Sequence, residues 1–368
     1  MSRKLTVAVV GLGIGAKHLD AYAELPDHYD VLAVCDLDRD KANAATGRYA
    51  GAKAVTDFAS LLAMPGLDVI DICTPPNTHR SLIEQALAAG FHVICEKPIT
   101  GSLQDVDAIE KAAENARGTL SPIFQYRFGS GLQKLKLLQA NGICGKPYLA
   151  TIETSWRRDA DYYAVPWRGR WATELGGCCL SQAIHAHDIL AYVNGPIKSV
   201  YARLATRVNP IEVEDCAAVS IEMVNGSLAT LAVTLGAAEE LSRIRFMFSN
   251  LTVESRSAHP YRIGDDPWYF KGKSPEIEAQ IAGVLAAFKP STESFSGQFE
   301  RIHASITGGE PLPVTLADAR VSLELITAIY HSAESGTAVN LPIANDHPKY
   351  GNWMPAGRAW GPGTGSNG

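Results

Sequence analysis

The glycine-rich turn near the N-terminus is the feature that most restricts how this chain can fold. A continuous apolar run at residues 4–10 leads directly into residues 11–16, which read Gly-Leu-Gly-Ile-Gly-Ala, and helical spacing of apolar residues follows at 15–24. An uninterrupted apolar run is typical of a parallel strand that is buried on both faces. A strand, a glycine turn and a helix in this order predict the first unit of a parallel α/β sheet, with a dinucleotide site at the turn.

An acidic residue stands where such a site needs one. Asp36 ends a second apolar run at 31–35 and comes 20 positions after Ala16. In this fingerprint the glycines let the backbone approach a pyrophosphate, and the helix N-terminus offers it free N–H groups. A carboxylate at Asp36 accepts hydrogen bonds from a ribose 2′-hydroxyl and repels a 2′-phosphate, so NAD is predicted over NADP, a preference that nearby Arg39 would soften. The predicted contacts in the turn are Gly11, Gly13 and Ile14. The alternative is a glycine turn that binds no ligand.

The rest of the chain divides into two regimes of secondary structure. Up to about residue 122, short apolar runs alternate with helical stretches, as in βαβ units. The runs expected there lie at 69–73 and 91–95, and the helices at 38–49, 77–89 and 102–116. Beyond this point, strands joined by short turns are typical of a mostly antiparallel sheet, and they are expected at 147–156, 198–206, 214–223, 227–235, 242–248 and 250–255. Three closing helices are expected at 275–288, 294–307 and 315–335.

These patterns predict an α/β chain with two domains. Residues 1–122 are expected to form an N-terminal Rossmann dinucleotide-binding domain, and residues 123–355 an α/β domain with a large, mostly antiparallel sheet. Residues 356–368 are rich in glycine and are expected to form a flexible tail. Two domains also agree with the length of 368 residues.

Composition excludes several classes of protein. Hydrophobic residues make up 46% and charged residues 20%, which suits a globular chain with a large core, and the net charge of −6 disfavours a nucleic-acid or membrane partner. Apolar runs stay far below the roughly 20 residues that span a bilayer, and the N-terminus lacks a signal-peptide pattern, so a cytoplasmic protein is expected. The seven cysteines are scattered and form no CxxC pair, so we expect reduced core residues and no thiolate zinc site.

Two further motifs connect the chain with a known family. Residues 72–79 read Ile-Cys-Thr-Pro-Pro-Asn-Thr-His, and Glu96-Lys97-Pro98 follows the next predicted strand. With the glycine turn, these motifs strongly resemble the Gfo/Idh/MocA family, the glucose-fructose oxidoreductase and inositol dehydrogenase group. The resemblance continues over nearly the whole chain, at residues 125–128, 162–163, 167–169 and 176–188 and at His347-Pro348.

The resemblance implies an NAD(P)-dependent oxidoreductase acting on CH–OH groups. It implies reversible hydride transfer from a secondary hydroxyl of a sugar, an inositol or a related polyol, with a second domain that binds this substrate and pairs with other copies in a homodimer or homotetramer. Along the cofactor it places Thr74, Pro75, Asn77, His79, Glu96, Lys97 and Gln125, and it has Trp167 and Arg168 close over the nicotinamide end.

Lys97 is the first candidate catalytic residue. It follows a predicted strand, at the carboxyl edge where open α/β sheets place ligands. An ammonium group there can hydrogen-bond a substrate oxygen and stabilise negative charge that develops on it. The alternative is a surface salt bridge between Lys97 and Glu96 or another acid.

His185 is the candidate general base, because imidazole titrates near neutral pH. Family members commonly carry an aspartate four residues before this histidine, and here the position is Ser181, which cannot raise the imidazole pKa as a carboxylate would. The predicted substrate contacts are Lys97, Arg157, Tyr163, Ser181, Gln182 and His185. The alternatives are a satisfied helix histidine and, for the polar-aromatic segment 157–168, an interface or a solvated loop.

No metal site is expected around this histidine. His185 and His187 are two positions apart, so on a helix they point about 200° apart and cannot share an ion. Asp188 and Tyr330 are assigned to packing or support.

Two other functions stay open: a glycosidase that retains NAD and cleaves by transient oxidation, and a non-catalytic dinucleotide sensor. A nucleotide-linked sugar substrate would need a basic patch for its diphosphate.

Overall fold

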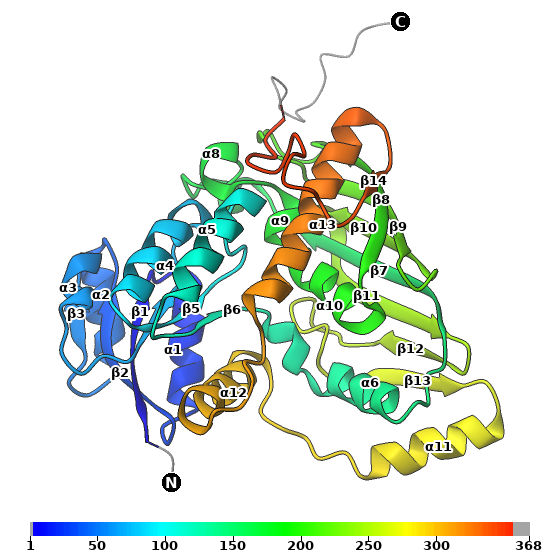
Figure 1. Cartoon of the computed structure of the whole chain (residues 1–368), viewed down its shortest axis with the longest axis horizontal. Helices are drawn as coiled ribbons and strands as arrows, with labels where there is room; N and C mark the ends of the chain where they lie inside the picture. The colour runs from blue at the N-terminus through cyan, green and yellow to red at the C-terminus, as the bar shows by residue number, and fades with distance from the viewer. Residues whose placement is uncertain (1–2, 356–368) are drawn as a thin grey trace, which may run out of the picture. The chain divides into compact units, whose positions relative to one another are not determined.

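The computed structural model describes residues 3–355 and contains two compact units, each built from two stretches of the chain (Figure 1). Within the described residues, the first unit ends at Gln125 and takes in Ser294–Ala319, while the second comprises Tyr126–Glu293 and the chain from Arg320 on. The predicted flexible tail at 356–368 lies outside the described residues.

A six-stranded parallel sheet forms the centre of the first unit, with the strand order β3-β2-β1-β4-β5-β6. This is the doubly wound Rossmann order, and it confirms the predicted fold of the N-terminal part. The strands are β1 (Leu5–Val10), β2 (Tyr29–Cys35), β3 (Lys53–Val55), β4 (Val69–Ile72), β5 (His92–Cys95) and β6 (Leu120–Pro122). All of β4 and nearly all of β1 are buried, as continuous apolar runs predict for a sheet covered on both faces.

Helices cover this sheet between its strands. They are α1 (Gly15–Ala23), α2 (Arg39–Thr46), α3 (Phe58–Leu62), α4 (His79–Ala88) and α5 (Leu103–Glu114), with a short 3₁₀ turn η1 (Pro76–Thr78). Their N-termini follow local capping chemistry: the Asp38 carboxylate accepts from the backbone of α2, and the Ser102 hydroxyl accepts from that of α5.

Helix α12 (Ser294–Gly308) completes the first unit from late in the sequence. Its Phe299 is fully buried, stacks on Tyr22 of α1 with ring centroids 4.5 Å apart, and accepts a hydrogen bond at its carbonyl from the Tyr29 hydroxyl. Helix α12 thus packs on α1. The N-terminal domain expected from the sequence, residues 1–122, does not include this helix.

The second unit is built on an eight-stranded sheet in the order β13-β12-β11-β7-β10-β9-β8-β14. Only β7 and β10 pair in parallel, so the sheet is mostly antiparallel, as predicted. The strands are β7 (Pro147–Arg157), β8 (Ile197–Ala205), β9 (Cys216–Met223), β10 (Leu228–Thr234), β11 (Gly236–Phe248), β12 (Leu251–Ser255), β13 (Trp268–Gly272) and β14 (Val339–Asn340). Burial alternates along β7 and β10, so one sheet face is packed and the other is open.

Helices α9 and α10 contact strands of this sheet, and α10 is almost entirely buried. The helices and turns outside the first unit's core are η2 (Gln125–Phe128), α6 (Ser130–Ala140), α7 (Ala160–Tyr163), α8 (Trp171–Glu174), α9 (Cys178–Ser181), α10 (Ile184–Asn194), α11 (Pro275–Ala286) and α13 (Leu316–Ser335). The three predicted closing helices correspond to α11, α12 and α13 within two residues, whereas α6, β13 and β14 had no clear sequence pattern.

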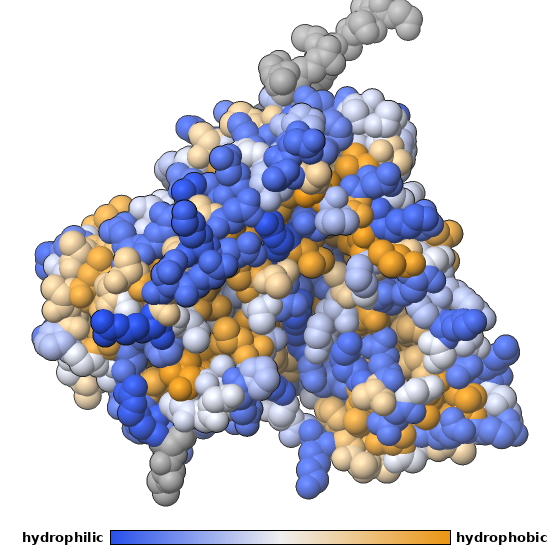
Figure 2. Space-filling view, in the orientation of Figure 1, coloured by the Kyte–Doolittle hydropathy of each residue, from blue (hydrophilic) through white to orange (hydrophobic). Residues whose placement is uncertain are grey.

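The cysteines are reduced, and the surface mixes polar and apolar residues. All seven cysteines are free thiols, six of them buried. Among residues 3–355, no helix combines the length and the apolar character that crossing a membrane requires. On the face shown in Figure 2, hydrophilic and hydrophobic residues are intermixed at the surface.

Candidate functional site

The predicted cofactor residues of the first unit gather at one edge of its sheet. Because the strands are parallel, the chain leaves all of them at the same edge. Backbone hydrogen bonds continue past the strand ends: Gly11 N donates to Cys35 O over 2.8 Å, and Glu96 N donates to Ile72 O over 2.9 Å. The loops after β1, β2, β4 and β5 therefore lie side by side.

The glycine turn has the shape that a dinucleotide needs. Gly11 has φ +90°, and a Cβ there would lie 2.8 Å from the carbonyl oxygen of Cys73. A Cβ on Gly13 would meet nothing within 4 Å, whereas one on Gly15 would lie 3.0 Å from the Val9 side chain. Gly13 thus borders open space beside the N-terminus of α1, where a pyrophosphate fits, and Gly15, which the pattern left unassigned, allows α1 to pack closely on β1.

The carboxylate of Asp36 is fixed at this turn. Its Oδ2 accepts from the backbone N–H of Leu12 over 2.8 Å, and its Oδ1 accepts from that of Asp38 over 2.9 Å. Each carboxylate oxygen has a further lone pair, so Asp36 can still accept from a ribose hydroxyl. The residues present therefore fit NAD.

The loop after β4 separates into accessible and buried residues. Thr74 and Pro75 are partly exposed and Asn77 is exposed, so all three can contact a ligand. His79 is fully buried; its Nε2 lies 2.8 Å from Thr74 O and its Nδ1 lies 2.9 Å from Pro98 O. Burial lowers the pKa of His79. The structure thus gives this ring a role in joining two loops at the site.

Lys97 follows β5 and is partly exposed, while the preceding Glu96 is buried. Glu96 Oε2 accepts from the backbone N–H of Lys97 over 3.0 Å, and Oε1 lies 3.1 Å from Nε2 of His18. The buried Glu96 carboxylate therefore supports the backbone of Lys97 from inside the protein.

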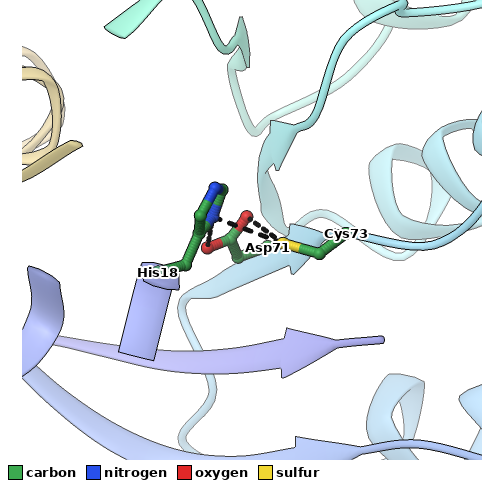
Figure 3. A group of neighbouring side chains, drawn as sticks. All are labelled: His18, Asp71 and Cys73. Atoms are coloured by element: carbon green, nitrogen blue, oxygen red, sulfur yellow. Dashed lines mark hydrogen bonds and ion pairs between the residues drawn. The ribbon is translucent and has the colours of Figure 1, made fainter. Parts of the chain in front are cut away.

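Beneath this loop lies a buried polar cluster that the sequence patterns did not reveal (Figure 3). Nδ1 of His18 lies 2.8 Å from Oδ2 of Asp71 and 3.3 Å from the sulfur of Cys73, and the Tyr22 hydroxyl donates to the same Asp71 oxygen over 2.9 Å. Two signals were present: a charged residue inside an apolar strand run, and a histidine on the sheet-facing side of α1. Burial raises the pKa of the Cys73 thiol, which keeps it protonated and favours a hydrogen-bonded network over a metal site.

In the second unit, the polar-aromatic segment forms a stack. The Arg168 guanidinium lies over the rings of Tyr162 and Trp167, at 4.0 and 4.3 Å from their centroids. The Tyr162 hydroxyl also accepts from Gln182 Nε2 over 2.8 Å. Tyr162 therefore connects Arg168, which also stacks on Trp167, with Gln182. The sequence patterns had not identified Tyr162 as a site residue.

The other two predicted residues of this segment differ in their surroundings. Arg157 is exposed at the end of β7, whereas the neighbouring Arg158 lies over the Trp156 ring at 5.0 Å and pairs with Glu240 at 2.8 Å. Tyr163 is partly buried and packs edge-to-face on Tyr162. Arg158, and not Arg157, is the arginine that packs among the aromatic residues.

His185 lies near the start of α10, is buried, and stacks on the Tyr126 ring with centroids 4.5 Å apart. Ser181 ends α9, and two residues separate it from α10. A spacing of four suggests that Ser181 and His185 lie on one face of the same helix. In the structure they belong to two separate helices.

The neighbours of His185 on α10 have structural surroundings. Burial lowers the pKa of His187 to about 3, and neither of its ring nitrogens has a hydrogen-bond partner in the part of the chain that the structure describes. Asp188 forms a buried two-bond pair with Arg127, at 2.7 and 2.6 Å. This agrees with the assignment of Asp188 to support.

Glu214 is a further buried residue that sequence reasoning missed. Its carboxylate accepts from the backbone N–H of Gly177 over 3.1 Å, from that of Cys179 over 3.0 Å, and from the Tyr330 hydroxyl over 3.1 Å. Tyr330 is thus a core residue, as expected. Burial raises the pKa of Glu214 to about 7. This single carboxylate holds the turn into α9, the helix that precedes His185.

Glu214→Gln should change how stability depends on pH. Since burial raises the pKa of Glu214 from 4.5 to about 7, its contribution to the unfolding free energy is present below pH 4.5 and is lost as the pH rises to about 7. We expect a wild-type slope of up to about 1.4 kcal/mol per pH unit in this window, which the amide flattens because it does not titrate. Urea unfolding at several pH values measures it. The exposed control Glu239→Gln should keep the wild-type slope, and an unchanged slope in Glu214→Gln would contradict the assignment.

Comparison with protein families identifies both units. Residues 5–124 match the model of the oxidoreductase family with an NAD-binding Rossmann fold, Gfo/Idh/MocA. Residues 132–254 match the Gfo/Idh/MocA C-terminal domain. The two matches together cover about two thirds of the chain.

Individual relatives span almost the whole length. The chain is 26% identical to D-apiose dehydrogenase of Rhizobium rhizogenes over 92% of this chain and 98% of the relative, and 25% identical to D-glucoside 3-dehydrogenase of Escherichia coli over 92% and 98%. It superposes on the WlbA dehydrogenase of Bordetella pertussis, solved with NADH and UDP-GlcNAcA, with a TM-score of 0.81 and 28% identity over 93% of this chain and 99% of that one. The chain belongs to the Gfo/Idh/MocA family of oxidoreductases, and its first unit is an NAD-binding Rossmann domain.

Proposed function

We propose that this chain is an NAD-dependent dehydrogenase that oxidises a secondary hydroxyl of a sugar, an inositol or a related polyol. The observation that carries the proposal is the placement of Lys97. It lies at the carboxyl edge of the Rossmann sheet, in the same row of loops as the glycine turn, and the buried Glu96 holds its backbone.

The chemistry follows from the charge on this lysine. NAD, when bound, supplies the acceptor for the hydride that leaves the substrate carbon. The Lys97 ammonium donates a hydrogen bond to the substrate oxygen, which polarises the hydroxyl in oxidation and stabilises negative charge on the oxygen in reduction. We assign the pyrophosphate to Gly11, Gly13 and Ile14, the ribose to Asp36, and further cofactor contacts to Thr74, Pro75, Asn77, Gln125, Trp167 and Arg168.

His185 is proposed as the group that takes the hydroxyl proton. Its ring is held by stacking on Tyr126, and it lies three residues after Gln182. The buried Oε1 of Gln182 has no hydrogen-bond partner among residues 3–355, so it can accept from a substrate hydroxyl. Tyr163 and Ser181 are the other proposed substrate contacts in this unit.

A free sugar or polyol is favoured over a nucleotide-linked one. The WlbA relative was solved with UDP-GlcNAcA, but a diphosphate would need unpaired basic groups. In this chain, Arg158 is paired with Glu240, and Arg168 lies 3.6 Å from Glu174. The names of the apiose and glucoside relatives also support a substrate without a nucleotide.

The first experiment is NADH formation with purified protein across a panel of inositols, pentoses, hexoses, their glycosides and UDP-sugars. Turnover of one stereochemical group of free sugars supports the dehydrogenase. Cleavage of glycosides with retained NAD and no net NADH would support the glycosidase, and cofactor binding without any turnover would support a sensor. Preference for a UDP-sugar would overturn the substrate class alone.

Lys97→Met should lower kcat by roughly 10²-fold, because the side chain that stabilises charge on the substrate oxygen is lost. NAD binding, measured by fluorescence titration, should stay within about threefold because Asp36 and the glycine turn are intact. Lys111→Met, at an exposed position on α5, serves as the matched control and should keep wild-type kinetics. Activity of Lys97→Met close to that of wild type would reject the catalytic role.

Asp36→Ser should shift the cofactor preference towards NADP. The variant loses the carboxylate that accepts a hydrogen bond from the ribose 2′-hydroxyl of NAD. It also loses the repulsion between this carboxylate and the 2′-phosphate of NADP, which costs several kcal/mol at close range. We expect the ratio of kcat/KM for NAD over NADP to fall at least about tenfold. A wild-type enzyme that already prefers NADP would show that Asp36 has been misread.

We also propose that the open face of the second unit's sheet pairs with the same face of another copy, in a homodimer or homotetramer. At the centre of this face, Thr230 lies opposite Thr151, and the small Ala232 lies opposite Glu153. Arg243 and Arg245 border the same shallow depression of about 240 Å³. Small side chains beside paired charges allow two sheets to approach closely.

Ala232→Lys should disrupt this association, because it places a long, charged side chain at the centre of the face on both copies, where like charges repel across the interface. Light scattering should give a multiple of the 39.5 kDa chain mass for wild type and the single-chain mass for the variant. Ser81→Lys, at an exposed position of α4 in the other unit, is the control and should keep the wild-type mass. A monomeric wild type would disprove the proposed interface.

A further inference from the structure

In the first unit, one histidine connects the helix of the glycine turn with the loop that carries Lys97. His18 of α1 is fully buried, and both of its ring nitrogens face carboxylates: Nδ1 lies 2.8 Å from Asp71 Oδ2, and Nε2 lies 3.1 Å from Glu96 Oε1. Figure 3 shows the ring turned towards Asp71 and Cys73 at the end of β4. No catalytic step assigned above uses this residue.

The two neighbouring carboxylates favour the charged form of this ring. An ionised carboxylate only accepts hydrogen bonds, so a ring between two of them donates from both nitrogens and is an imidazolium. It then supplies the counter-charge for two carboxylates that are removed from water, where an unpaired charge would be very costly. Although burial, the largest influence, opposes the charged form, the neighbouring Asp71 carboxylate holds the pKa of His18 well above its ordinary value.

The side chains that face this ring come from α1, β4, the loop after β5 and α12. From α1 comes the Tyr22 hydroxyl, which donates to Asp71; from β4 come Asp71 and the protonated Cys73; and from the loop after β5 comes Glu96. Helix α12 contributes only aromatic rings, Phe295 at 4.5 Å and Phe299 at 5.2 Å from the ring of His18. His18 thus contacts the inner oxygen of Glu96 through Nε2.

The other oxygen of Glu96 reaches the proposed catalytic loop. Oε2 accepts from the backbone N–H of Lys97 over 3.0 Å, while Oε1 is held by His18. With His18 in place, the carboxylate cannot rotate away from the lysine without breaking a buried charged hydrogen bond. A displacement of the Lys97 backbone by about 1 Å would move its ammonium enough to lower the rate severely.

We propose that His18 is a positioning residue for Lys97, an imidazolium that bridges Asp71 and Glu96 and so fixes the carboxylate that holds the Lys97 backbone. The inference rests on the proposed catalytic role of Lys97 only for its effect on rate; the bridge itself can be tested without turnover. It couples the start of the cofactor-binding helix to the residue that contacts the substrate oxygen.

The charge of the ring is tested first, on the wild-type protein. Nitrogen-15 NMR of the histidine side chains should show one ring among the ten histidines that keeps both ring protons at about pH 8.5, where ordinary imidazoles are neutral. A spectrum in which every ring is neutral at this pH would overturn the proposal. This measurement needs no variant.

The link to the lysine is tested by hydrogen exchange of the Lys97 amide, followed by mass spectrometry of the protein without substrate. His18→Gln should speed this exchange roughly tenfold, because Glu96 loses its partner and releases the amide. The matched control is Tyr22→Phe, which removes another donor to the same cluster but leaves the His18–Glu96 contact, so exchange should stay within about threefold of wild type. Unchanged exchange in folded His18→Gln would disprove the link. If His18→Gln does not fold, the nitrogen-15 spectrum still decides the charge of the ring. Asp71→Asn, which should shift the ring towards its neutral form, then replaces His18→Gln in the exchange experiment.

Kinetics then separate this inference from the proposed function. With the sugar that reacts fastest in the panel, His18→Gln should lower kcat roughly 10- to 100-fold with NAD affinity nearly unchanged. Added to Lys97→Met, it should cause little further loss, because both changes remove the action of one lysine. Fully additive losses would show that His18 acts by another route. A fully active Lys97→Met would reject the catalytic role of the lysine. The nitrogen-15 spectrum and the exchange rate of the Lys97 amide would still test the His18 bridge, because neither depends on turnover.

Discussion

The contact between the loops after β1 and β4 is the constraint on which the rest of the first unit depends. Gly11 can pass the carbonyl of Cys73 only because it has no Cβ, which would lie 2.8 Å from that oxygen. This close approach starts α1 directly at the sheet edge, so that three residues beyond Gly15 the side chain of His18 enters the sheet beside Asp71. The missing Cβ of Gly11 thus allows the close approach of the two loops, above the buried cluster of His18 and Asp71.

Local patterns in the sequence predicted what local physics determines. Continuous apolar runs gave the parallel strands, the glycine spacing gave the turn, and the residues that follow strand ends, Asp36 and Lys97, came to one edge because parallel strands end together. The missed features are single contacts between distant positions. Asp71 lies 53 positions from His18, and Phe299 of α12 lies 270 positions from its partner Tyr29. No periodicity or spacing encodes such pairs, although a charge inside an apolar run indicates that some partner must exist.

The two units satisfy their buried charges in different ways. In the first, His18 lies between two carboxylates, and one of these holds the backbone of Lys97, the proposed catalytic lysine. In the second, Arg127 and Asp188 neutralise each other through two short hydrogen bonds. In the first arrangement, Glu96 also contacts the backbone of Lys97. In the second, Arg127 and Asp188 bond to each other and support the packing around α10.

This difference bears on the kind of substrate that the second unit can hold. Its arginines at positions 127, 158 and 168 have carboxylates beside them, so these groups offer little to a phosphate. The same unit holds the Gln182 amide bonded to the Tyr162 hydroxyl, and the Tyr126 ring stacked on His185. Groups of this kind bind neutral hydroxyl groups and the C–H faces of sugar rings. The replacement of the family's aspartate by Ser181 removes one more charge from this region. This set of groups is the physical basis for the neutral polyol that we propose as the substrate, because such a ligand leaves no charge of its own unpaired.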